Sequence, residues 1–194
     1  TSGLPFIAGG SGLSEVFEMD EDKKSHFFRQ LEELESTYDA VIFDMGAGVT
    51  NDLLNFILAS DEVFVVTTPE PTAVTDAYAA LKFVSRKSDG ALDVRMIVNR
   101  CKSEMEGKET ARRLANVAGR FLDQKIDAFH IVPDDPVVSN AVKAGVPFML
   151  YSPKAAVSRS IREIAEEWCG LQGREGGFLR KLKTYFHFGK ERAL

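Results

Sequence analysis

A short apolar run that ends in a carboxylate and two glycines constrains this chain more than any other stretch. The run is Val41–Phe43, and Asp44, Gly46 and Gly48 follow it. Continuous β-branched and aromatic residues are typical of a strand that is buried on both faces of a parallel sheet. Ligands of open parallel sheets bind beyond the carboxyl ends of the strands, so this pattern predicts that Asp44 faces a ligand crevice.

The two glycines indicate what kind of ligand that crevice takes. Without side chains at positions 46 and 48, a phosphate can approach the backbone N–H groups. A carboxylate beside an anion requires a cation between them, and the simplest candidate is Mg²⁺. We expect Asp44 to hold a magnesium-bound water while the metal bridges phosphate oxygens.

Two other interpretations of this stretch stay open. The first is a structural turn from strand to helix in which Asp44 is only a cap. The second is a dinucleotide fingerprint, because residues 46–51 read G-x-G-x-x-N and Glu70 follows at about the distance that motif requires. Asn51 in place of the third glycine, and Asp44 unscreened beside a pyrophosphate, both count against the fingerprint.

Apolar runs and amphipathic segments alternate along the rest of the chain. This alternation, without a hairpin signal, predicts an α/β fold with a mostly parallel sheet flanked by helices. An apolar run at 4–7 ends in a glycine-rich loop at 9–12, interpreted as a turn because it lacks the Lys and Ser/Thr of a phosphate loop. The remaining expected strands are 38–43, 62–67, 93–99 and 126–132, and the expected helices are 22–36, 51–59, 71–87, 108–121, 137–144 and 155–171.

Length and composition are those of one domain with a tail. The chain has 194 residues, of which 44% are hydrophobic, enough for one core at 1–171. Its two cysteines lack C-x-x-C spacing, which favours a reducing compartment, and no apolar run is long enough to span a membrane. We therefore expect a cytoplasmic protein with a flexible linker at 172–177 and a tail helix at 178–189.

The tail differs in charge from the rest of the chain. Residues 172–194 hold six basic and two acidic residues, a net charge of +4, so the remainder carries −9 of the total of −5. At helical spacing the apolar residues share one side, as in a basic amphipathic helix that lies on an anionic membrane. The alternative is a helix that docks onto its own domain. The predicted membrane-facing residues are Phe178, Leu179, Leu182, Tyr185 and Phe186.

Two further strand ends carry polar residues suited to a nucleotide. Asn99 offers both a donor and an acceptor, as pairing with the N6/N7 edge of adenine requires, although an Asn at this position also serves as a cap. Arg100 follows it, and Pro133 with Asp134 follow the next strand. Since carboxyl ends of parallel strands share one edge of a sheet, we expect these residues to lie close together.

Taken together, these motifs resemble the MinD/ParA branch of P-loop ATPases, and most of all its FlhG/FleN (YlxH) flagellar-number regulators. The resemblance covers about residues 1–170 and depends on the combination rather than on any single motif. The segments that carry it are residues 9–12, 38–48, 68–78, 98–100 and 132–134.

The resemblance implies roles for individual residues. Asp44 would be the catalytic acid linked to Mg²⁺, and Gly46 would meet the γ-phosphate of ATP. Asn99 with Arg100 would read adenine, and Pro133 with Asp134 would line the base pocket. The resemblance also implies an ATP-dependent homodimer, with residues 70–76 near the partner, flagellar assembly proteins as further partners, and peripheral membrane association through the tail.

The sequence departs from the family in one respect that bears on its function. The family begins with a strand and a phosphate loop, K-G-G-x-G-K-[ST], which this sequence lacks, so the chain alone should bind ATP weakly and hydrolyse almost none. A missing first strand would also leave a sheet edge that invites oligomerisation.

Two alternatives to an ATP-dependent flagellar regulator stay open. They are a non-enzymatic adaptor and a chromosome-partitioning or amidotransferase-like relative. The acidic body disfavours direct nucleic-acid binding.

Overall fold

The computed structural model describes residues 6, 20–46, 51–88, 92–170, 178–179 and 181–184. The chain forms two compact units. Thr1–Ser60 with Gly176–Leu194 form one, here called the helical unit, and Asp61–Glu175 form the other, the sheet unit. This division differs from the expected body at 1–171, because the tail packs with the first two helices rather than standing apart.

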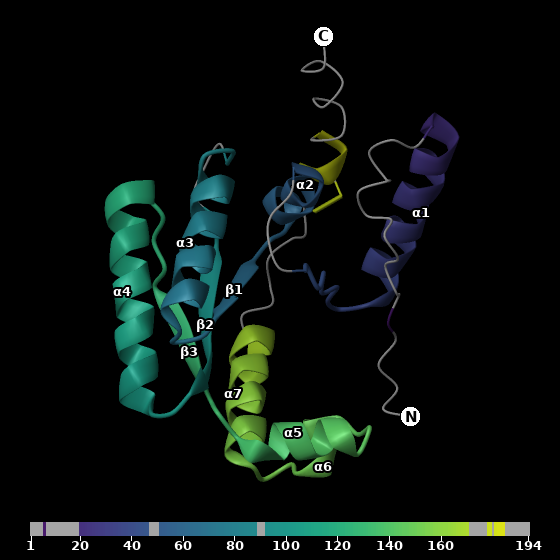
Figure 1. Ribbon diagram of the computed structural model, residues 1–194. Helices are drawn as coiled ribbons and strands as arrows, with labels where there is room; N and C mark the ends of the chain where they lie inside the picture. Colours follow the sequence, from purple (N-terminus) through teal and green to yellow (C-terminus); the bar gives the residue numbers. More distant parts are fainter. Residues whose placement is uncertain are drawn as a thin grey trace. The chain divides into compact units, whose positions relative to one another are not determined.

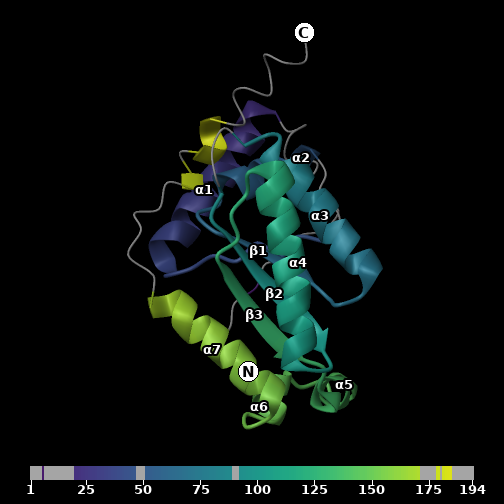
Figure 2. The same ribbon diagram turned by 90° about the vertical axis from the view of Figure 1, so that its left-hand side faces the viewer.

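Three parallel strands form the centre of the sheet unit (Figures 1 and 2). They are β1 (Val63–Thr67), β2 (Val94–Cys101) and β3 (Ala128–Pro133), in the order β1-β2-β3. Phe64 lies opposite Arg95, and Arg95 lies opposite Ala128. The expected parallel sheet is confirmed for these strands.

Helices cover both faces of this sheet (Figure 1). The strongly apolar face, which includes Met96 and Val98, packs against α3 (Pro71–Ser85) and α4 (Glu104–Leu122). The opposite face meets α7 (Ala156–Gly170), which lies along β3. Each of these three helices was expected within a few residues of its observed ends.

The segment between β3 and α7 contains α5 (Pro136–Lys143) and α6 (Phe148–Tyr151), the second of which was not expected. Asp135 caps α5, since its Oδ1 accepts a hydrogen bond from Val137 N at 3.0 Å. Gly145 ends α5 with a φ of 65°, the left-handed conformation that favours glycine at this position. Pro147 then redirects the chain into α6.

The helical unit contains α1 (Glu21–Thr37), α2 (Asn51–Ala59) and helical turns at 178–179 and 181–184. Both longer helices lie where the sequence predicted them. Their shared core contains Leu31, Phe56, Ala59 and Leu182, with Phe56 and Leu182 fully buried. The apolar face of the tail therefore supplies part of this core.

The predicted strand at 38–43 is wrong. Residues 38–46 are extended but form no strand, and Ile42 is 79% exposed. A strand exists only where a neighbouring strand accepts its hydrogen bonds, and none of the described residues of this unit supplies one. Instead Phe43 and Met45 pack into the helical core while Asp44 and Gly46 alternate outward.

Gly107 lies where α4 approaches the sheet closely. A Cβ at this position would lie 2.7 Å from Ile131 Cγ2 and 3.0 Å from Cys101 Sγ. We expect Gly107→Ala to lower the free energy of unfolding by about 1–2 kcal/mol, because overpacking outweighs the gain in helix propensity. Urea unfolding measures this loss.

Gly119 provides the matched control on the same helix. A Cβ there comes no nearer than 3.9 Å to another atom outside the local helix backbone. Gly119→Ala should therefore raise stability by about 0.5–1 kcal/mol through helix propensity alone. Two substitutions with effects of the same sign would contradict the close approach of α4 to β3.

Candidate functional site

The carboxyl ends of β2 and β3 bring four of the predicted site residues together. Asn99 and Arg100 lie just before Cys101, the last residue of β2, and Pro133 ends β3 directly beside Cys101. The backbone N–H of Asp134 donates to Cys101 O at 2.9 Å, which holds the two strand ends side by side. The sequence predicted this arrangement, and their role in binding a base stays a prediction.

Arg100 adopts an unusual backbone conformation at this edge. Its φ is 57°, a left-handed value that costs a non-glycine residue about 1 kcal/mol or more. The pairing of β2 with β3 shifts register between Val98 and Cys101, so Arg100 lies in an irregular part of the ladder. The turned backbone places Arg100 Nε 3.7 Å from Asp134 Oδ1, and both side chains are more than half exposed.

Asn99 stabilises the turned backbone at Arg100 and still has hydrogen-bond donors and an acceptor available for a ligand. Its Oδ1 accepts a hydrogen bond from Arg100 N at 2.9 Å. A carboxamide oxygen has a second lone pair, and the amide nitrogen has two further donors. The cap interpretation of Asn99 and the ligand-binding one are therefore compatible.

Thr68 is a residue of this edge that sequence reasoning missed. It follows β1 directly, and its Oγ1 is a buried oxygen without a hydrogen-bond partner in the part of the chain that the structure describes. An unpaired buried hydroxyl costs about 1–3 kcal/mol, so such a group is a candidate ligand contact. The available signal was the Thr67-Thr68-Pro69 sequence, in which the proline ends the strand just after Thr68.

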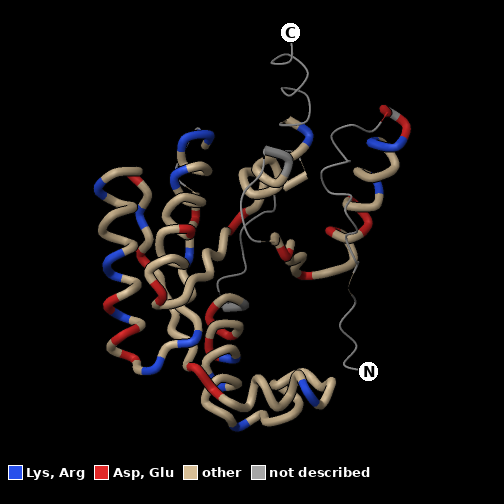
Figure 3. Tube along the Cα trace, viewed as in Figure 1, with Lys and Arg blue, Asp and Glu red and all other residues tan. Residues whose placement is uncertain are grey.

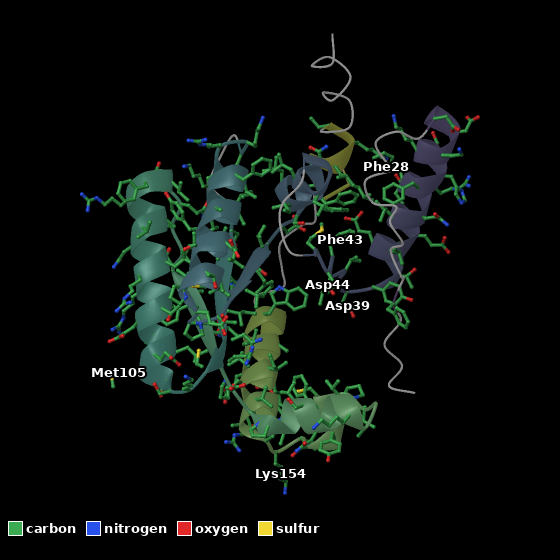
Figure 4. The ribbon with its side chains drawn as sticks, in the orientation of Figure 1. Phe28, Asp39, Phe43, Asp44, Met105 and Lys154 are labelled. Carbon is green, nitrogen blue, oxygen red and sulfur yellow. The ribbon has the colours of Figure 1, made fainter. Side chains whose placement is uncertain are left out.

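Asp44 and Gly46 belong to the helical unit, whereas the residues of the sheet edge belong to the sheet unit. Asp44 is exposed (Figure 4), and a Cβ at Gly46 would meet no atom within 4 Å. The contact of Gly46 with a phosphate stays a prediction. That Asp44 and Asn99 meet at one nucleotide stays a prediction.

The candidate residues of the two units differ in how they fit magnesium and nucleotide. Mg²⁺ takes six oxygen ligands, and Asp44 supplies a single carboxylate. Among the described residues no three His, Cys, Asp or Glu side chains gather where they could hold a metal. The carboxylate therefore fits only a metal whose other ligands are water and phosphate, whereas the amide and guanidinium at the β2 end fit a base directly.

Cys101 is a structural thiol beneath this edge. Its Sγ donates to Val98 O at 3.3 Å, and burial raises the pKa of the thiol to about 11. A thiol with this pKa stays protonated at neutral pH and is a poor nucleophile. Cys101 thus packs the strand end rather than reacting there.

The predicted membrane-facing residues are divided between described and undescribed parts of the chain. Tyr185 and Phe186 lie outside the described residues, as do residues 1–5, the loop at 9–12, Gly48 and the linker at 172–177. Phe178, Leu179 and Leu182 pack into the core of the helical unit. The Phe178 ring lies 5.1 Å from the Phe43 ring between centroids. The docked arrangement of the tail is the one that the structure shows.

Comparisons with known proteins agree with this fold. The chain is 26% identical over 165 residues to the antiactivator FleN of Pseudomonas aeruginosa, covering 85% of this chain and 59% of FleN. It is 30% identical over 164 residues to the flagellum site-determining protein YlxH of Helicobacter pylori, covering 84% and 55%. The chain thus spans 55% to 59% of the length of these two relatives.

A solved structure shows the same architecture. The septum site-determining protein MinD of Pyrococcus horikoshii, complexed with Mg-ADP, matches with a TM-score of 0.57 at 23% identity. The match covers 75% of this chain and 56% of the MinD chain. No family model matches the chain. The predicted α/β fold class is confirmed.

Proposed function

Because the chain belongs to the MinD/ParA family of P-loop ATPases, we propose that it is part of a nucleotide-dependent regulator of the number or placement of flagella. The observation that carries the proposal is the shared edge of Asn99, Arg100, Pro133 and Asp134. An amide and a guanidinium at the ends of parallel strands suit an adenine base. YlxH, which is named a flagellum site-determining protein, supports the cellular output.

Each of these residues has a different role in binding ATP. Asn99 pairs with the base edge through its remaining amide donors and acceptor, and Pro133 packs against the base plane. Arg100 stays oriented by the carboxylate of Asp134. Asp44 would help to hold a magnesium ion, which would neutralise charge on the phosphates. Hydrolysis and ATP-dependent dimerisation belong to the whole protein.

Membrane attachment is the part of the proposal that involves the tail. Phe178, Leu179 and Leu182 cannot contact lipid while they pack into the helical core. Attachment therefore requires the tail to undock, and two tails presented by a dimer would bind far more tightly than one. No helix within the described residues combines the length and the apolar character that crossing a bilayer would need.

Affinity of the full-length protein for ATP tests the base end of the proposal. We expect Asn99→Ala to weaken ATP binding at least about tenfold, a loss of about 1.4 kcal/mol, and to reduce the preference for ATP over GTP. Isothermal titration calorimetry measures both affinities. Asn116→Ala is the matched control, because Asn116 is exposed on α4. Equal affinities in the two variants would refute the role of Asn99.

A second pair of variants tests the metal end. Asp44→Asn should leave binding of ATP without magnesium unchanged and abolish the gain in affinity that magnesium gives. Asp39→Asn is the control, since Asp39 is an exposed carboxylate five residues earlier (Figure 4). A normal magnesium effect in Asp44→Asn would remove Asp44 from the site. Normal flagellar counts in cells whose protein has lost ATP binding would favour an adaptor that works without nucleotide.

A further inference from the structure

The surface of α5 and α6 combines exposed apolar side chains with positive charge. Val142 is 74% exposed, Leu150 59%, Tyr151 48% and Val146 39%. They lie on two short helices that pack on each other, and Val146 N donates to Ala141 O at 3.1 Å across the turn that joins them. Together with Lys143 and Lys154 these residues define the α5–α6 surface.

The charge of this segment is opposite to that of the chain. Residues 136–162 contain four basic residues and no Asp or Glu, in a chain of net charge −5. Figure 3 shows blue and no red along the traces of α5 and α6. Two acidic residues flank this segment directly. Asp135 is engaged on both oxygens by the N–H groups of Val137 and Val157, and Glu163 follows in α7.

Two of the four cations have a structural role and two do not. The guanidinium of Arg159 donates to Lys154 O at 2.8 Å, and that of Arg162 donates to Pro153 O at 3.3 Å. Lys143 and Lys154 form no ion pair with any described residue. Lys154 extends away from the sheet unit (Figure 4). These two ammonium groups are available to pair with negatively charged groups of another molecule.

We propose that the α5–α6 surface docks an acidic, amphipathic segment of a partner protein. An apolar centre that includes a tyrosine, with lysines around it, has the composition of a protein interface with a polar rim. Nucleic acid is bound mainly through several Lys or Arg contacts to phosphates, and this surface offers two lysines. The surface lies outside the nucleotide site, so this inference goes beyond the proposed function and does not depend on it.

Binding of designed peptides to the full-length protein, without nucleotide, tests the proposal. The probe is a fluorescent helical peptide of about 18 residues, or five turns, with leucines on one face and glutamates on the other. A second peptide carries lysines in place of the glutamates. We expect the acidic peptide to bind, the basic one not to bind, and the affinity to fall as salt is raised. Fluorescence anisotropy measures each affinity.

Variants of the protein locate the binding. We expect Val142→Ser with Leu150→Ser, and separately Lys143→Glu with Lys154→Glu, each to weaken binding of the acidic peptide at least about tenfold. Phe121→Ser with Lys125→Glu is the matched control, because it removes an exposed apolar and an exposed basic side chain at the end of α4. Circular dichroism verifies that each variant folds.

Three results would overturn the inference. Equal binding of the acidic peptide by the surface variants and the control would place the peptide elsewhere. Loss of binding to phosphatidylglycerol vesicles or to duplex DNA, with peptide binding unchanged, would make the surface a lipid or nucleic-acid site. A dimer, measured by analytical ultracentrifugation, that dissociates only in the surface variants would make the occupant a second copy of the chain.

Discussion

Replacing Leu182 by alanine is expected to destabilise the helical unit by about 2–5 kcal/mol. Leu182 has no exposed surface and packs with Leu31, Phe56 and Ala59. Truncation leaves a cavity between the tail and two helices, which cannot fully close around it. Native-state hydrogen exchange measures the effect within this unit alone, as faster exchange of the amides in α1 and α2.

An exposed leucine provides the control for this substitution. Leu150→Ala removes the same atoms from a side chain that is 59% exposed and should change stability by less than about 0.5 kcal/mol. If the tail stood free in solution, both leucines would behave alike. A loss below about 0.5 kcal/mol for Leu182→Ala would therefore show that the tail is undocked.

Weakening the site that receives the tail separates docking from membrane binding. Phe43 lies 5.1 Å from Phe178 and 5.6 Å from Phe56 between ring centroids, so Phe43→Ala loosens the tail without changing its sequence. The ion pair of Lys183 with Glu32, at 2.6 Å, is about half exposed and adds little. If the tail binds lipid, the Phe43→Ala variant should bind anionic vesicles more tightly than the parent protein.

Local chemistry predicted much of the sheet unit. Buried parallel strands are continuous apolar runs, so the strand that ends at Asn99 was identifiable without structure, as was the helix that Pro71 opens. Parallel strands share one carboxyl edge, which is why the sequence placed Asn99 and Pro133 together. The observed register at Cys101 and Pro133 bears this out.

The wrong strand and the alternatives that the sequence left open have a common physical cause, because both depend on neighbours distant in sequence. The apolar run Val41–Phe43 is the same in a strand and in an unpaired extended segment, because only a hydrogen-bonding partner distinguishes them. The tail pattern likewise fits a membrane or a protein core. The unpaired hydroxyl of Thr68 and the ion pair of Arg95 with Glu62 likewise result from packing that no local sequence pattern predicts.

Arg95→Met is expected to cost about 3 kcal/mol of stability in the sheet unit. Arg95 lies on the sheet face toward α7, where its Nε donates to Glu62 at 2.6 Å and its guanidinium donates to Glu167 at 3.1 Å. Its side chain is 11% exposed and that of Glu62 15%. Burial opposes the charge of Arg95, but the hydrogen bonds to both carboxylates outweigh it and raise the arginine pKa.

The size of this loss follows from what the methionine leaves behind. Methionine fills much of the volume of the arginine side chain but leaves the carboxylate of Glu62 buried without its partner. Breaking a buried ion pair in this way costs about 3–5 kcal/mol. The lower end applies because Glu167 is half exposed and stays hydrated. His130 Nε2, 3.9 Å from Glu167, compensates only when protonated. Urea unfolding gives the value.

A double-mutant cycle distinguishes an ion pair from simple packing. Adding Glu62→Gln to Arg95→Met removes the stranded charge and should recover about 1–2 kcal/mol. Lys108→Met is the control, since its partner Glu104 is exposed and the pair should contribute less than about 0.5 kcal/mol. If Arg95→Met cost no more than Lys108→Met, the charged cluster would contribute nothing to holding α7 on the sheet.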